Sequence, residues 1–256
     1  MGHLVGMGGI HIPGECVRAL ELQLDSLCTE VGFPPRSEFK WSPGRELWMR
    51  SNLTGEARTE FFRRGIGLAR DAGAEALVVI EDTEHQTAGG AGTHEEDVVN
   101  LFLERANHCL DRARQGLILV DTPGGDRLDE GSFLGRCLDT IQHGTSYVRF
   151  DRIALNVIAT RSALVRLLQL ADVVTSCTLA YVAGEGRYSP PVFESIRPIL
   201  RAEYGRVGGV GVKIHPDGRY ANLYHWLLGD AHFVRNQTGH PLPFADRPYH
   251  RSPEAP

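Results

Sequence analysis

The chain has 256 residues, 42% of them hydrophobic, and a net charge of −5, so it can bury a core without disulfides or metals, and extensive disorder is excluded. Its five cysteines are odd in number and far apart, which excludes a disulfide framework and a zinc knuckle. The N-terminus shows no basic flank, and no apolar run approaches the roughly 18 residues of a membrane span, so we expect a cytoplasmic protein without membrane contact.

The predicted elements alternate between strands and helices. Apolar residues at three- and four-residue steps indicate the helices, and short apolar runs indicate buried strands. In chain order they are a strand at 3–12, a helix at 15–31, a loop at 33–53, a helix from the N-cap Thr54 to about Ala72, a strand at 75–82, a mobile glycine-rich loop at 87–92, a helix at about 94–114, a strand from Gly116 to Asp121, a helix near 129–143, a strand near 152–159, a helix near 163–182, a strand at 208–214 and a short helix around 219–228.

This alternation is typical of an α/β domain whose mixed, partly parallel sheet is flanked by helices. We interpret residues 1–235 as one such domain. Residues 236–256 are rich in proline, histidine and charge, and we expect them to form a loosely ordered tail.

Asp121 follows five apolar residues and precedes a Pro-Gly-Gly turn. This position predicts a carboxylate at the carboxyl end of a buried strand, the edge where sites collect in open α/β sheets. An aspartate there is also a common turn former, and that alternative stays open.

Asp172 stands in the otherwise apolar helix near 163–182. An unpaired buried charge costs several kcal/mol, so Asp172 needs a cation, a metal or solvent at a cleft. Gln169, three positions earlier, shares its direction. The alternative is an aspartate at the helix rim that faces water.

Glu38 and Lys40 are two positions apart in an extended segment, so their side chains lie on one side and can serve one site as an acid and a base. A surface ion pair is the alternative. Glu104 is a further carboxylate, but its charged neighbours indicate a solvated helix face.

Several motifs are absent from the sequence. It contains no H-E-x-x-H, no phosphate-binding P-loop, no dinucleotide fingerprint and no G-x-S-x-G elbow. The sequence therefore does not support a zinc protease, an ATPase, a dehydrogenase or a serine hydrolase.

Three elements together resemble the domain-of-unknown-function 3800 family: Glu38-Phe39-Lys40-Trp41, the strand-end Asp121, and Ser162 followed by Gln169-Leu170-Ala171-Asp172. The resemblance covers roughly residues 4–215. It implies a ribonuclease H-like fold in which carboxylates hold Mg²⁺ or Mn²⁺. By this resemblance Asp121, Asp172 and Glu38 would bind metal, Lys40 would be a site residue, and Ser162 and Gln169 would support them.

The chain departs from that family at its start. Members usually begin with a strand that ends in D-E-S-G and supplies the first catalytic acid, whereas this chain begins with the strand that should come second. Either the natural protein starts earlier, or the chain is a degenerate member.

The leading hypothesis is a metal-dependent nuclease that hydrolyses phosphodiesters of DNA or RNA. The alternative is a catalytically degenerate module that binds nucleic acid or protein through the basic 187–219 region. That region contains Arg187, Arg197, Arg201, Arg206, Lys213 and Arg219. Unpaired amides at a sheet edge would also allow a homodimer.

Overall fold

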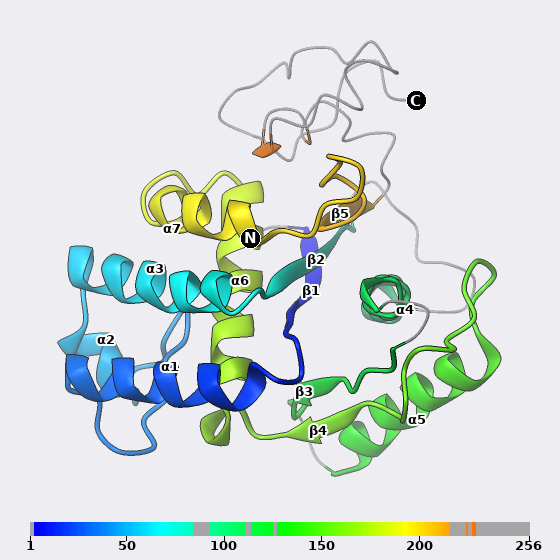
Figure 1. The fold of residues 1–256 in the computed structure, drawn as a ribbon, viewed down its shortest axis with the longest axis horizontal. Coiled ribbons are helices and arrows are strands. Elements are labelled where there is room, and N and C mark those ends of the chain that lie inside the picture. The colour runs from blue at the N-terminus through cyan, green and yellow to red at the C-terminus, as the bar shows by residue number, and fades with distance from the viewer. Residues whose placement is uncertain are drawn as a thin grey trace.

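The computed structural model describes residues 3–83, 93–110, 114–124 and 127–215, together with Tyr224, Leu227 and Leu228. Two small sheets organise these residues (Figure 1). The first has the order β1-β2-β5, and the second pairs β3 with β4 in parallel. The strands are β1 (Leu4–His11), β2 (Glu75–Asp82), β3 (Leu119–Asp121), β4 (Ile158–Thr160) and β5 (Val212–His215).

Helices cover both sides of the first sheet, and α5 packs with the second (Figure 1). The helices are α1 (Val17–Val31), α2 (Trp48–Asn52), α3 (Gly55–Asp71), α4 (His94–Cys109), α5 (Arg127–His143), α6 (Arg166–Val182) and α7 (Ser189–Ile196), with short 3-10 helices η1 (Ser162–Leu164) and η2 (Arg197–Ile199).

Strand β2 lies at the centre of the first sheet, antiparallel to β1 and parallel to β5. Val78 and Ile80 pack with α1, α3, α6 and α7, whereas Leu77 and Val79 pack against α4. Successive side chains of a strand point to opposite faces, so a strand covered on both faces must be apolar throughout. This explains the run from Ala76 to Ile80.

Helix α6 approaches β1 closely because two glycines of the strand have no side chain. A Cβ added at Gly6 would lie 2.6 Å from Leu179 Cδ1, and one added at Gly8 would collide with Thr175 of the same helix. The glycines of β1 therefore fix the distance between the sheet and the helix that carries Gln169 and Asp172.

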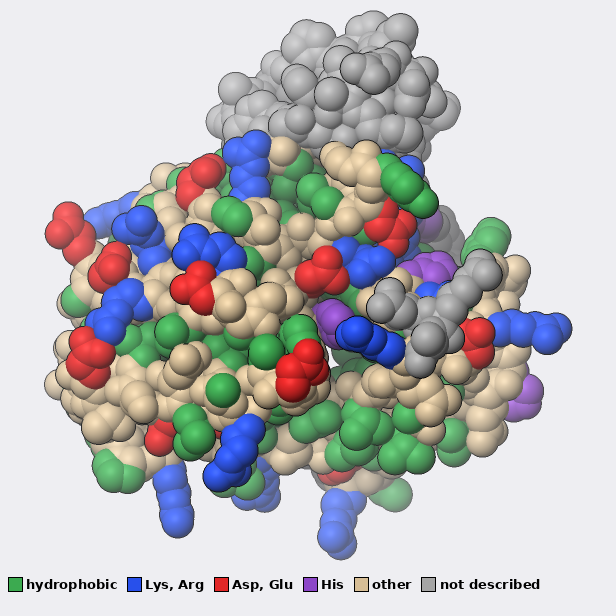
Figure 2. Space-filling view, viewed as in Figure 1, with side chains coloured by type: hydrophobic (Ala, Val, Ile, Leu, Met, Phe, Trp, Pro, Cys, Tyr) green, Lys and Arg blue, Asp and Glu red, His purple; other side chains and the backbone are tan. Residues whose placement is uncertain are grey.

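The second sheet belongs to a separate hydrophobic cluster. Val120 packs with Leu103 of α4, Cys137 of α5 and Phe150. The expectation of a strand buried from Gly116 onward is wrong, because β3 spans three residues and Leu119 is 47% exposed. Figure 2 shows hydrophobic side chains gathered over the region of β3 and β4.

The α/β class with mixed strands flanked by helices is confirmed. The expected strands at 3–12 and 75–82 and the helices at 15–31 and 129–143 agree with the structure within a few residues, whereas α2 and α7 were not expected. The loop at 87–92, most of the helix at 219–228 and the tail at 236–256 lie outside the described residues.

No helix among the described residues is long and apolar enough to cross a membrane.

Candidate active site

Two side chains of α6 hold the extended segment that contains Glu38 and Lys40. The Phe39 amide donates to Gln169 Oε1 at 3.2 Å, and the Trp41 amide donates to Asp172 Oδ2 at 3.1 Å. Phe39 and Trp41 are two positions apart, and Gln169 and Asp172 lie almost one helical turn apart, so the two hydrogen bonds fasten the segment along the helix.

The alternation of the segment places Glu38 and Lys40 on the other side, next to each other. Lys40 Nζ lies 3.6 Å from Glu38 Oε2, and the side chain of Lys40 is 37% exposed. The expected proximity of this acid and base is therefore present.

Ser162 connects the remaining predicted residues. Its amide donates to Asp121 Oδ1 at 2.8 Å, and its hydroxyl donates to Glu38 Oε1 at 3.3 Å. Its carbonyl accepts from Gln169 Nε2 at 2.8 Å. Ser162 is buried, as is its hydrogen bond with Gln169, whereas its bonds to Glu38 and to the exposed Asp121 are only partly buried. We call the six residues Glu38, Lys40, Asp121, Ser162, Gln169 and Asp172 the Ser162 cluster.

Arg166, in the first turn of α6, completes this arrangement and was missed in the sequence. It is buried, and its Nη1 donates to Gln169 Oε1 at 3.0 Å and to the Ser37 carbonyl at 2.6 Å. Its Nη2 lies 3.1 Å from Asp25 of α1. A signal was available, because a charged residue inside an apolar helix needs an anion or several acceptors.

Asp172 has protein partners at both oxygens. In addition to the Trp41 amide, the Ser176 hydroxyl donates to Oδ1 at 3.2 Å. The sequence had pointed to a cation, a metal or solvent as the partner, but the structure shows that an amide and a hydroxyl satisfy this carboxylate.

The donor set limits how a metal ion can be held. No group of three or more His, Cys, Asp or Glu side chains within the described ranges is arranged to hold a metal ion. Asp121 and Glu38, however, both bond to Ser162, and Mg²⁺ commonly uses one or two carboxylates together with water and substrate oxygens. The residues fit such a partly solvated ion and do not fit an all-protein cage.

Glu104 does not lie on a solvated face as expected. It is 8% exposed, accepts a hydrogen bond from Thr145 Oγ1 at 2.5 Å and lies 3.8 Å from Arg105 Nη1. Glu104 therefore anchors the segment before Val148 to α4, apart from the Ser162 cluster.

The basic 187–219 region is not a continuous stripe of free cations. Arg201 pairs with Glu75 and Glu203 at 3.1 and 2.6 Å, and Lys213 is only 8% exposed. Arg197 donates to the Leu228 carbonyl, and Arg219 lies outside the described residues. Arg187, in contrast, is exposed and stacks on Tyr188.

A second buried carboxylate was also missed. Glu81, at the end of β2, is fully buried, and its Oε1 lies 2.6 Å from His94 Nδ1 of α4. Burial raises the pKa of the Glu81 carboxyl, while the hydrogen bond from His94 opposes that rise. The pair joins the start of α4 to the sheet.

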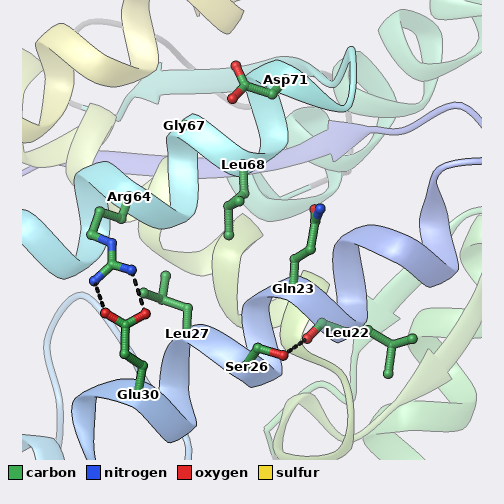
Figure 3. A pocket seen from close by; sticks show the side chains of 9 residues that line it. All are labelled: Leu22, Gln23, Ser26, Leu27, Glu30, Arg64, Gly67, Leu68 and Asp71. Carbon is green, nitrogen blue, oxygen red and sulfur yellow. Dashed lines mark hydrogen bonds and ion pairs between the residues drawn. The ribbon is translucent and has the colours of Figure 1, made fainter.

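A surface groove of about 500 Å³ lies between α1 and α3 and not at the Ser162 cluster (Figure 3). Leu27 and Leu68 line it, and Arg64 forms two hydrogen bonds to Glu30 at one end. A second groove of about 320 Å³ lies between α4 and α5. Neither is lined by a residue of the Ser162 cluster.

No protein-family model, no curated protein and no solved structure matches this chain.

Proposed function

We propose that the Ser162 cluster is the active centre of a metal-dependent hydrolase that cleaves nucleic-acid phosphodiesters. One observation carries the proposal: Ser162 bonds two carboxylates from distant parts of the chain, Asp121 and Glu38. The resemblance to the domain-of-unknown-function 3800 family and its ribonuclease H-like fold is part of the same proposal.

Each residue has a role that follows from its contacts. Asp121 and Glu38 would hold the ion, and Ser162 orients both carboxylates. The Lys40 ammonium, beside Glu38 and partly exposed, is placed to contact a phosphate oxygen. Gln169 and Asp172 are positioning residues, because they hold the segment that carries Glu38 and Lys40. A bound Mg²⁺ or Mn²⁺ supplies a Lewis acid and an activated water.

The test is cleavage of labelled single- and double-stranded DNA and RNA in Mg²⁺ or Mn²⁺. Asp121→Asn keeps an acceptor for the Ser162 amide but removes the charge. Loss of an outer-shell partner alone costs about 10- to 100-fold in metal sites, so loss of this ligand should exceed that range. Asp151→Asn is the control, because its side chain is 74% exposed and, among the described residues, forms an ion pair with Arg152 alone.

Metal binding gives a readout that is independent of turnover. A ligand that binds only the folded state raises the melting temperature. Mn²⁺ should raise it for the wild type and for Asp151→Asn, but not for Asp121→Asn. An equal rise in all three proteins, or none in the wild type, would contradict the proposed metal site.

The second candidate is a binding module that no longer cleaves. It is favoured by one observation, that both oxygens of Asp172 already accept hydrogen bonds from the protein. This candidate would be supported by nucleic-acid binding that weakens with salt but does not depend on metal. The binding should be unchanged in Asp121→Asn, and no cleavage should follow it.

A further inference from the structure

Three arginines and a tyrosine gather where α2, α3 and the start of α7 meet. Arg58 of α3 donates to the backbone carbonyl of Arg50 on α2 at 3.5 Å, and α3 packs against α7, which begins directly after Tyr188. The guanidinium carbon of Arg187 lies 4.9 Å from the centre of the Tyr188 ring. We call Arg50, Arg58, Arg187 and Tyr188 the basic-aromatic patch.

No carboxylate of the described residues forms an ion pair with the arginines of this patch. Arg58 donates instead to the carbonyls of Leu53 and Met49, at 2.7 and 3.1 Å. Burial, and after it the charge of Arg50, lowers the pKa of the Arg58 guanidinium. Glu185, the acid nearest to Arg187 along the chain, is bonded to backbone amides at the start of α7, and Glu60, two positions after Arg58, pairs with Arg63.

The rest of α3 shows the contrasting arrangement. Arg63, Arg64 and Arg70 pair with Glu60, Glu30 and Asp71. Figure 2 shows red and blue side chains interspersed over the face that carries α1 and α3. Of the arginines on α3, Arg58 alone has no such carboxylate partner among the described residues. Because like charges repel, its grouping with Arg50 and Arg187 favours an anionic ligand.

The patch adjoins the Ser162 cluster through one buried residue. The amide of Lys40 lies 3.2 Å from Met49 Sδ, and Arg58 donates to the carbonyl of the same methionine. Met49 is fully buried and Lys40 belongs to the cluster. A chain of phosphates bound at the patch would therefore lie close to the candidate active centre.

We propose that the basic-aromatic patch binds single-stranded nucleic acid and leads the strand to the Ser162 cluster, an inference that rests on the proposed function. Arginine forks match phosphate oxygens. Tyr188 is 54% exposed, and a base can stack on an aromatic ring only when it is not paired in a duplex. A groove that combines both features recognises single strands with little sequence preference.

Binding is measured by fluorescence anisotropy with labelled single strands of DNA and RNA and with a duplex, in EDTA so that metal-dependent cleavage cannot occur. Tyr188→Ala should weaken binding of a single strand about tenfold, within the range for loss of one stacked base, and Tyr188→Phe should restore it. Arg50→Ala with Arg187→Ala should lower the slope of log affinity against log salt by about 0.7 for each phosphate that the variant no longer neutralises.

Arg70→Ala is the matched control, because Arg70 lies on α3 and is exposed but pairs with Asp71. Its affinity and salt slope should equal those of the wild type. The inference would be overturned if Arg70→Ala lost as much affinity as the patch variants. It would also be overturned if duplex and single strand bound equally well and Tyr188→Ala did not change either affinity.

The two proposals fail differently. If the patch variants weaken binding in EDTA but the wild type cleaves nothing in Mg²⁺ or Mn²⁺, the proposed hydrolase is contradicted and the proposed binding patch is supported. Cleavage that depends on Asp121 and is unchanged in every patch variant would support the hydrolase and overturn the patch.

Discussion

Gln169 is the residue through which most of the Ser162 cluster is connected. Its amide oxygen accepts from the Phe39 amide and from Arg166, and its amide nitrogen donates to the Ser162 carbonyl. The residue is 1% exposed, so water cannot replace these partners. A buried amide that uses both ends in this way fixes two segments that lie far apart in the sequence.

Gln169→Leu should therefore destabilise the protein strongly. The substitution puts an apolar side chain of similar size in place of the amide and leaves the buried Phe39 amide without an acceptor, which costs about 1–3 kcal/mol. It also removes one hydrogen bond from the Ser162 carbonyl, which keeps the Val165 amide as a donor, and one from Arg166, and each of these contributes about 0.5–1.5 kcal/mol. We expect a loss of about 2–4 kcal/mol in the free energy of unfolding, measured by urea denaturation.

Gln23→Leu on α1 is the control, since Gln23 is exposed and a surface substitution usually changes stability by less than about 0.5 kcal/mol. Similar losses in the two variants would show that Gln169 contributes no more than a surface glutamine.

The residues that the structure brings together in the candidate site were singled out from the sequence, but most of their hydrogen-bond partners were not. Strand-end position singled out Asp121, helical context singled out Asp172, and the family resemblance supplied Ser162. The hydrogen bonds from Ser162 to Asp121 and from Trp41 to Asp172, however, join residues 41 and 131 positions apart, and local patterns carry no information about such pairs. For this reason the Trp41 amide was not foreseen as a partner of Asp172, whereas Arg166 was missed although its place in an apolar helix was a signal.

At the scale of elements, α4 and α3 differ in how they begin. Thr93 caps α4 with its side chain, accepting from the Glu96 amide, while Glu96 accepts from the Thr93 amide. Thr54 occupies the N-cap position of α3, as expected, but its side chain makes no capping hydrogen bond. The same residue type thus satisfies helix amides in one case only.

Thr93→Ala should lower the free energy of unfolding by about 1 kcal/mol, because a helix amide loses its acceptor. Thr54→Ala should leave stability almost unchanged, since its side chain makes no cap bond to remove. Thermal or urea unfolding of the two variants side by side measures the difference, and a larger loss in Thr54→Ala would contradict this account of the two caps.

Element boundaries deviated from the sequence predictions for identifiable physical reasons. Helix α7 was missed because Pro190 and Pro191 suggest a chain break, although proline is tolerated in the first helical turn, where amides lack partners in any case. Strand β3 is shorter than predicted, since β4 is its one strand partner in the described part of the chain and one of its faces is exposed. Strand β2, with partners on both edges and both faces, matched closely.

At the scale of the whole molecule, the two sheets belong to separate hydrophobic clusters. Strand β2 pairs along its length with β1 and along four residues with β5, and it is buried almost throughout. The parallel pair of β3 and β4 has three residues per strand, with Leu119 and Ile158 exposed on one face. On the side away from β2, β1 has no strand partner among the described residues, and the homodimer through this edge stays a prediction.

Native-state hydrogen exchange should therefore separate the two sheets. Opening free energies within a protein range from near zero in weakly packed elements to the global value in the core. The amides of β2 that bond to β1 should exchange only through global unfolding, whereas Val120 and Thr160 should exchange through a local opening that costs less by about 2 kcal/mol or more. Peptide-resolved exchange at increasing urea measures both, because global openings depend steeply on denaturant and local ones do not. Equal protection and equal urea dependence in the two sheets would mean that the clusters unfold as one unit, and that the backbone of the strand that carries Asp121 is as stable as the centre of the molecule.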